Sequence, residues 1–394
     1  MSDSEERTER QEDISEVNGD EEEVQSKPFQ PWYSVQIKNA SKNGDIVMFD
    51  VTTTKLEQCK EEVEVERQYE DFEWLEHCLS IQQDVKGVIF PPLPDRPIVS
   101  AAEAEARSKK QLGTQSKNMK GDEFHKDCRK LEKYLQAVVK HEAFGKNEAL
   151  MHFLTKKEPP VRAKLKKGIL SNLSRAVDGV RKGGHKDVDE TFQKERELAN
   201  DMLKITKESS VTFDVMVNNT CRISAAYNHL STALCLGMSA EDNGASAVIN
   251  KLQAEFAKSI DHYAHGVDVF STNDDNTLGF TLEYYSRYWD STKEMLFRRT
   301  CALVQYENCS KTLEKAKPQK KAMAEAAKDD AEKELNSISE VAKKEIAKFH
   351  HQRTLDFQKS LILYAEAKVK AARDVYALLA KDLSTIKQMD VDFD

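Results

Sequence analysis

The residues best suited to chemistry stand where a predicted strand meets a predicted helix. Arg67 is followed directly by Gln68 and Tyr69. A guanidinium next to an aromatic ring suits phosphate binding, because its N–H groups can bond two phosphate oxygens at once. Gln68 adds no charge, and the acids nearby are Glu64, Glu66, Glu70 and Asp71. The pattern therefore indicates a phosphate-site corner that lacks a second cation and repels highly charged anions.

A second candidate, residues 161–186, combines an apolar stripe with many cations. The stripe follows spacings of four or three residues: Leu165, Ile169, Leu173, Val177 and Val180. Eight Lys and Arg residues accompany a single acid, and they include Lys166, Lys167, Arg175, Arg181 and Lys182. A basic amphipathic helix of this kind is typical of membrane surfaces. The alternative, that the stripe packs on a neighbouring domain, stays open.

A third cluster of cations surrounds Pro318, where two long helices should be joined by a turn. Its members are Lys315, Lys317, Lys320 and Lys321. A lysine close to an anionic leaflet contributes about 1 kcal/mol to membrane binding. The sequence leaves two interpretations open, a membrane-binding tip and a solvated surface.

Motifs for catalysis or cofactor binding are missing from the sequence, which contains no Walker A, G-x-G-x-x-G, H-E-x-x-H or G-x-S-x-G pattern. His262 and His265 lack acid or thiol ligands at a matching spacing, so a metal site is not indicated. An isoelectric point of about 5.7 disfavours nucleic-acid binding. We therefore expect no enzyme, no cofactor, no metal and no nucleic acid.

The corner must be positioned by a small α+β domain. Residues 32–69 alternate as in strands, with an Asn-Gly turn at Asn43 and Gly44, and predict a three-stranded antiparallel meander. Helical spacing follows from Phe72, and the prolines of residues 88–97 then require an extended loop. An apolar stripe from Leu131 predicts a closing helix. The domain is expected to cover residues 28–157.

Residues 186–394 have a helical composition that is interrupted at three places: 237–246, 271–279 and Pro318. Helices this long cannot bury an apolar stripe alone, so we expect a coiled-coil rod that dimerises. The aromatic residues of 282–289 are expected to lie in its core. Residues 158–185 would be a linker that carries the basic helix.

Charge and cysteine content place the chain in a reducing compartment. Residues 1–27 hold eleven acids and three basic residues, which accounts for nearly all of the net charge of −9 and predicts a disordered acidic tail. The seven cysteines show no CxxC pair, and no apolar run is long enough to span a membrane. We expect a cytoplasmic protein.

The order of these parts resembles the PX-BAR sorting nexins: a strand meander with "RQYEDF", a proline loop and a closing helix, then a basic amphipathic helix and three long helices. The stretches "RQYEDFEWL" (67–75) and "LFRRTCALVQYENCSKTLEKAK" (296–317) are most similar to the subgroup of sorting nexins 5, 6 and 32. The resemblance implies a PX domain followed by an all-α BAR domain.

For the site residues, the resemblance implies a degenerate phosphoinositide corner made of Arg67, Gln68, Tyr69, Phe72 and Arg96. In phosphoinositide-binding PX domains an arginine occupies the position of Gln68 and binds the 3-phosphate. The subgroup instead binds extended cargo peptides beside a helical insertion, here residues 98–130, and Phe124 would be the aromatic residue of that groove.

For partners, the resemblance implies heterodimers with a sorting nexin 1 or 2 type BAR subunit, with a homodimer left open, together with a retromer-type cargo complex and cargo cytoplasmic tails. It also implies binding to anionic and phosphoinositide-containing membranes, and a peripheral location on early endosomes and their tubules. The function would be curvature generation and cargo sorting in retrograde endosome-to-Golgi or recycling transport. The alternative is a cytosolic coiled-coil scaffold whose PX-like domain binds only protein.

Overall fold

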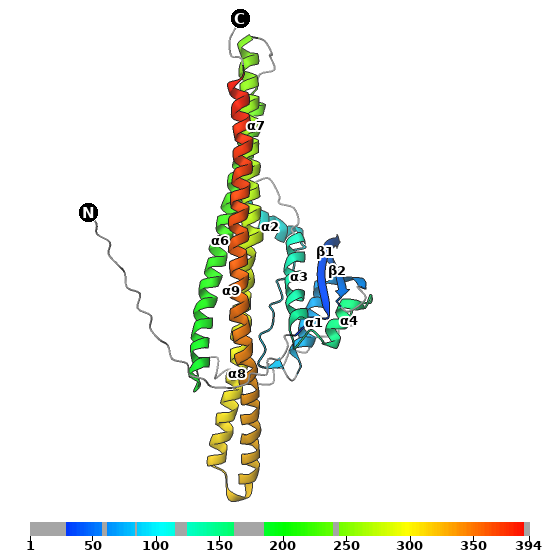
Figure 1. Cartoon of the computed structure of the whole chain (residues 1–394), viewed down its shortest axis with the longest axis vertical. Helices are drawn as coiled ribbons and strands as arrows, with labels where there is room; N and C mark the ends of the chain where they lie inside the picture. The colour runs from blue at the N-terminus through cyan, green and yellow to red at the C-terminus, as the bar shows by residue number, and fades with distance from the viewer. Residues whose placement is uncertain are drawn as a thin grey trace, which may run out of the picture.

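A computed structural model describes residues 29–56, 61–82, 85–114, 124–160, 185–238 and 244–389. These residues form a small N-terminal domain that lies against the side of a long helical rod (Figure 1). The acidic segment 1–27 and the segment 161–184, which holds most of the predicted amphipathic helix, lie outside the described residues.

The N-terminal domain begins with three strands, β1 (Tyr33–Asn43), β2 (Ile46–Lys55) and β3 (Glu62–Gln68), in the order β1-β2-β3. Both pairings are antiparallel, with Ile37 opposite Val51 and Val51 opposite Val65, so the predicted meander is confirmed. Gly44 in the first turn has a φ of 64°, which a residue without a Cβ adopts at little cost.

Four helices complete this domain: α1 (Tyr69–Ser80), α2 (Ala101–Leu112), α3 (Phe124–Lys140) and α4 (Glu148–Thr155). The apolar face of α3, which includes the buried Leu131, Leu135 and Val138, packs with β-sheet residues such as Val51 into one core. The proline-rich residues 88–97 run as an extended loop, as the sequence predicts.

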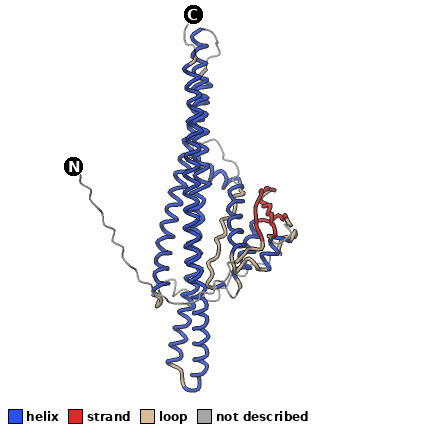
Figure 2. Tube along the Cα trace, in the orientation of Figure 1, coloured by secondary structure: helices blue, strands red, loops and turns tan. Residues whose placement is uncertain are grey.

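The rod consists of α6 (Glu190–Leu236), α7 (Gly244–Asp274), the π-helical turn η3 (Asp275–Gly279), α8 (Phe280–Glu314), a short 3-10 turn η4 (Pro318–Lys320) and α9 (Lys321–Lys387). At about 1.5 Å per residue, α9 is roughly 100 Å long. Figure 2 shows these helices running side by side, with the hairpin of α8 and α9 extending beyond the start of α6.

The break expected at residues 271–279 is wrong. The chain stays helical from α7 through η3 into α8, so the second long helix runs from residue 244 to residue 314. Asp, Asn and Thr favour turns when their side chains compete for main-chain groups. Here tertiary partners hold the acids instead: Asp274 binds Lys368 of α9 at 2.7 Å, and Asp275 binds Lys126 of α3 at 2.8 Å. The breaks at 237–246 and at Pro318 are confirmed.

Aromatic residues of 282–289 lie in the rod core, as expected. Tyr285 and Trp289 are 1% and 0% exposed, and both pack against Phe349 of α9. The same cluster contains Ile89 from the proline-rich loop of the N-terminal domain. One apolar core therefore continues from the rod into the contact with the N-terminal domain.

Gly87 shows how closely the two parts approach each other. A Cβ at this position would lie 2.6 Å from the carbonyl oxygen of Ile338 and 2.9 Å from Cβ of Val341, both on α9. Because one of these atoms belongs to helix backbone, it cannot move aside as a flexible side chain would.

We predict that Gly87→Ala loosens the N-terminal domain from α9. Hydrogen exchange should become faster in residues 85–90 and in residues 334–345, while exchange in the sheet stays unchanged. Gly237→Ala is the matched control, because the nearest contact of its new Cβ would be the carbonyl oxygen of Ala233, at 3.3 Å. Equal exchange in the two variants would show that α9 tolerates the added methyl group.

Candidate functional site

Arg67 of the predicted corner is buried and fully engaged in the structure. Its side chain is 0% exposed at the end of β3. Nε donates to the carbonyl oxygen of Phe153 at 3.0 Å, Nη1 to that of Glu66 at 2.7 Å, and Nη2 to that of Lys156. Burial lowers the pKa of Arg67, and the charge of Asp71 opposes this. The guanidinium therefore holds the end of α4 against the sheet and does not face a ligand.

Gln68 begins α1. Its main-chain N–H donates to Oδ2 of Asp71 at 2.8 Å, which caps the first turn of the helix. Its half-buried amide side chain carries no charge. The position next to the aromatic residue thus supplies no cation for a phosphate group.

The remaining corner residues do come together in space. The hydroxyl of Tyr69 donates to the carbonyl oxygen of Pro94 at 2.5 Å, and burial raises its pKa. Phe72 is 0% exposed and contacts Phe49 and Phe153, so it belongs to the core. The guanidinium of Arg96 lies over the Tyr69 ring, 5.1 Å from its centre.

Arg96 is the exposed cation of the corner, but two acids of α1 already neutralise it. It forms ion pairs with Glu70 at 2.6 Å and with Glu73 at 2.9 Å. An anionic headgroup would have to displace both carboxylates or remain beside them. The electrostatics of this corner therefore oppose phosphate binding.

Phe124, the predicted groove residue, is the first residue of α3. It is partly buried and packs against the core of the N-terminal domain. The preceding insertion helix α2 reaches the rod: Arg222 of α6 donates to the carbonyl oxygens of Lys110 at 2.6 Å and Gln111 at 3.1 Å. Gly113 ends α2 with a φ of 96°.

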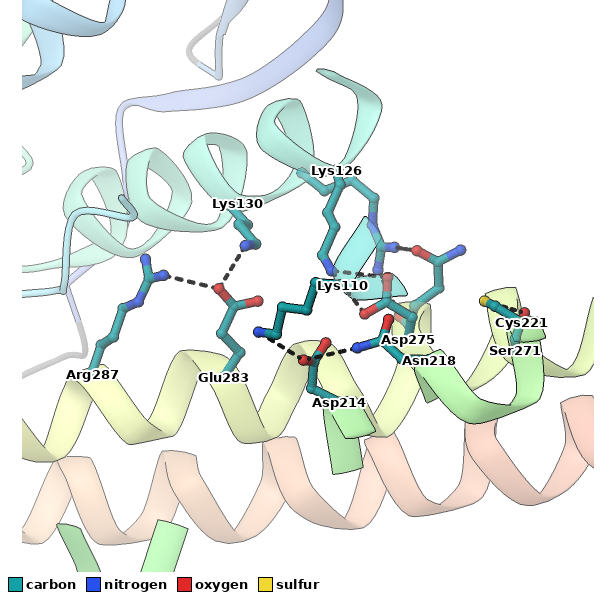
Figure 3. A network of polar contacts seen from close by, with 12 residues as sticks. Lys110, Lys126, Lys130, Asp214, Asn218, Cys221, Ser271, Asp275, Glu283 and Arg287 are labelled. Atoms are coloured by element: carbon teal, nitrogen blue, oxygen red, sulfur yellow. Dashed lines mark hydrogen bonds and ion pairs between the residues drawn. The ribbon is translucent and has the colours of Figure 1, made fainter. Parts of the chain in front are cut away.

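Residues of α3 that sequence reasoning missed attach the N-terminal domain to the rod. Lys126 pairs with Asp275 at 2.8 Å, Lys130 with Glu283 at 2.5 Å, and Lys133 with Asp356 at 2.9 Å (Figure 3 shows the first two). Between them, Arg129 donates to the carbonyl oxygen of Asn276 at 2.7 Å. We call this contact, together with the Gly87–Ile89 loop on α9, the joint.

The cations at the joint favour the ionised form of Glu283. Burial alone would raise the pKa of Glu283, but Lys130 and Arg287 outweigh this, and the pKa is lowered. A signal for the joint was present in the sequence, since cations at 126, 129, 130 and 133 follow helical spacing on the face away from the apolar stripe of α3. Without the rod's fold, such a row is indistinguishable from a solvated face.

The lysines at the predicted tip are exposed. Lys315, Lys317, Lys320 and Lys321 surround the turn between α8 and α9, at the end of the rod (Figure 1). The stripe of the predicted amphipathic helix, Leu165 to Val180, and its cations Lys166, Lys167, Arg175, Arg181 and Lys182 lie outside the described residues. That helix stays a prediction.

Comparison with protein families assigns both parts. Residues 56–157 match the PX domain, and residues 167–380 match the family described as Vps5 C terminal like. The second match alone covers more than half of the chain. The chain belongs to the PX-BAR sorting nexins.

Individual relatives agree with this assignment. Human sorting nexin-6 is 30% identical over 376 residues, which cover 89% of this chain and 91% of that protein. Human sorting nexin-32 is 27% identical over 385 residues, which cover 90% of this chain and 93% of that protein. Human sorting nexin-2 is 25% identical over 397 residues, which cover 93% of this chain and 73% of that protein. The solved SNX-BAR Mvp1 tetramer matches with a TM-score of 0.49 and 14% identity, over 90% of this chain and all of that one.

Membership in this family implies endosomal membrane remodelling and sorting. Sorting nexins act as peripheral membrane proteins of endosomes, form dimers and are in general not enzymes. Among the helices that the structure describes, none is long and apolar enough to cross a bilayer. Within the same residues, no group of three or more His, Cys, Asp or Glu could hold a metal ion.

We predict that Arg67→Ala destabilises the PX domain, because it leaves the carbonyls of Phe153 and Lys156 without donors. The loss should be about 3 kcal/mol or more, measured as faster hydrogen exchange in β3 and α4 of the full chain. Arg96→Ala is the control and should cost less than about 1 kcal/mol, since its ion pairs are exposed. If the two variants behaved alike, Arg67 would not have the structural role described above.

Proposed function

We propose that this chain is a coat subunit that dimerises through its rod, shapes endosomal membranes and selects cargo through its PX domain, without catalysing a reaction. A row of exposed apolar residues along α6 carries this proposal. Its members recur at spacings of seven or eleven residues: Leu198, Ile205, Met216, Ile223 and Leu230.

Spacings of seven and eleven residues are close to two and three helical turns, so these side chains share one face. α9 also exposes Leu361, Ile362 and Tyr376, the last of them at 76%. An apolar surface of this length on a soluble helix bundle marks an interaction surface. A second rod of the same kind matches its length, whether it is another copy of this chain or a sorting nexin 1 or 2 type subunit.

We predict that Ile223→Glu weakens or abolishes the dimer, because the interface would have to bury an unpaired carboxylate. The test is the molar mass by light scattering, alone and with a sorting nexin-2 type subunit. Asn200→Glu, at an exposed polar position of the same helix outside this row, is the control and should leave the mass unchanged. A dimer of unchanged stability in Ile223→Glu would place the interface elsewhere.

The proposed membrane-binding surface is the tip, Lys315 to Lys321. These lysines form no ion pair with another described residue, so their charges are available to anionic lipids. At about 1 kcal/mol each, four lysines suffice for binding that weakens with salt. The predicted helix of residues 161–186 would add an apolar anchor beside them.

We predict that changing Lys315, Lys317, Lys320 and Lys321 together to Glu reduces binding to anionic vesicles at least tenfold in a sedimentation assay. The same four positions changed to Arg keep the charge and should bind like the unmodified protein. Undiminished sedimentation of the Glu variant would leave membrane binding to other surfaces of the chain.

For cargo, we propose that the PX domain binds an extended cytoplasmic tail beside Phe124 and β1. The first half of the β1 edge is already occupied, because Ile37 donates to Oε2 of Glu132 at 2.8 Å and the carbonyl of Val35 accepts from Gln136 at 3.4 Å. Residues 40–43 pair with β2 on one side, and among the described residues no α3 side chain bonds the main chain of residues 38–43 on the other side. This half could add a peptide strand.

The corner of Arg67, Gln68, Tyr69, Phe72 and Arg96 would then bind phosphatidylinositol 3-phosphate weakly or not at all. Support comes from the burial of Arg67 and from the two acids on Arg96. We also propose that the protein acts on early endosomes and their tubules. There it would work with a retromer-type cargo complex in retrograde or recycling transport.

A further inference from the structure

A large cleft lies behind the joint, between the PX domain and the rod. Its volume is about 760 Å³, which is within the range of pockets that bind small ligands or single peptide side chains. Its walls come from α1, the loop at residues 82–90, α8 and α9. Much of the lining is apolar, including Val85, Phe90 and Ile338.

The two main cations of this cleft are already engaged. Lys86 forms an ion pair with Glu334 of α9. Arg298 donates to the carbonyl oxygens of Lys86 at 3.0 Å and Val88 at 2.6 Å, and it lies over the Phe90 ring at 5.1 Å. Both hold the loop against the rod, so neither is available to an anion.

The carboxylates of the cleft differ in whether they are paired with a cation. Glu73 forms an ion pair with Arg96 at 2.9 Å, and Asp290 forms one with Lys207 at 2.8 Å. Glu76 and Glu294 form no ion pair with any residue that the structure describes. Oε1 of Glu294 is closed off from solvent and lacks a hydrogen-bond partner among those residues. The cation that acts on Glu294 is Arg298, whose N–H groups are bonded to carbonyl oxygens of the loop. A second cation in the cleft would therefore reduce the cost of keeping Glu294 ionised there.

We propose that this cleft binds an arginine side chain, flanked by apolar residues, of a partner polypeptide. Glu76 would accept its N–H groups, the charge of Glu294 in the cleft wall would attract the guanidinium, and the apolar walls would cover its methylene chain and its neighbours. Arginine fits better than lysine, because a guanidinium is less strongly hydrated and offers five donors to two carboxylates. Anionic lipid headgroups are excluded by the same acids. Since the walls belong to both domains, the ligand would also strengthen the joint.

Burial, together with the charge of Glu73, raises the pKa of Glu76 to about 7. Ionisation of Glu76 between pH 6 and pH 8 should therefore tighten binding of a cation. The ionisable groups that line the cleft or interact with Glu76 are Tyr69, Glu73, His77, Lys86, Tyr134, Asp290, Glu294, Arg298, Cys301 and Glu334. The Glu76→Gln variant separates the contribution of Glu76 from that of these neighbours.

The test is calorimetric titration of the full-length protein with the peptide acetyl-Leu-Arg-Leu-amide. Binding is expected for the unmodified protein and should be about tenfold or more weaker for Glu294→Gln and for Glu76→Gln. Glu340→Gln, at an exposed acid of α9 outside the cleft, is the matched control and should bind normally. Helix content and dimer mass should be unchanged in all three variants.

Two comparison peptides decide what the cleft recognises. Acetyl-Leu-Gln-Leu-amide and acetyl-Leu-Glu-Leu-amide should bind much more weakly, and hydrogen exchange in residues 85–90 should slow only with the arginine peptide. Equal binding of the three peptides, or unchanged affinity in Glu294→Gln, would overturn the proposal. Affinity for the arginine peptide should rise about five- to tenfold from pH 6 to pH 8. If this rise persisted in Glu76→Gln, Glu76 would not be its source and the pH dependence proposed here would be wrong.

Discussion

Cations on one face of α3 hold the PX domain against acids of the rod, and the positions of all the other surfaces depend on this contact. The ion pairs of Lys126, Lys130 and Lys133 are largely shielded, with side-chain exposures of 18% to 32%. Partly buried pairs of this kind add little net stability, but a shift of register would leave each charge unpaired. Burial of Ile89 in the rod's core supplies the apolar contribution, about 1.5 to 3 kcal/mol. The ion pairs therefore fix the register of the joint, and the apolar loop provides affinity.

The joint also explains the π-helical turn. Asp275 and Asn276 lie in this turn and face Lys126 and Arg129 of α3. A π-helical turn inserts an extra residue and changes which side chains face outward. Residues 271–279 thus stay helical despite their turn preference, because α3 and α9 bind their polar groups. The same arrangement leaves the cleft beneath α1 open and places Glu76 and Glu294 on its walls.

The corner around Arg67 combines the expected strand-to-helix architecture with guanidinium groups that are bonded within the protein. The strand-to-helix junction, the tyrosine that stacks on an arginine and the proline loop are all present. Every guanidinium in this corner, however, is bonded to the protein itself, either to carbonyl oxygens or to acids of α1. The PX scaffold then serves for contacts with protein: with the rod through α3, and in our proposals with cargo tails and an arginine-bearing partner.

The sequence by itself determined the features that rest on local periodicity and local breaks. Alternation gave the meander, the prolines gave the extended loop, and the absence of breakers gave the long helices with Tyr285 and Trp289 in their core. The identity of Gln68 alone predicted that the position beside Tyr69 carries no cation. Only the tertiary structure decided the continuity through residues 271–279, the carbonyl partners of Arg67, the joint and the cleft. Apart from the bond of Arg67 to its neighbour Glu66, each of these depends on residues more than 80 positions apart in sequence, such as Arg67 with Phe153 and Lys126 with Asp275. Periodicity carries no information about such pairs, because it describes the face of one helix or strand and not what packs against it.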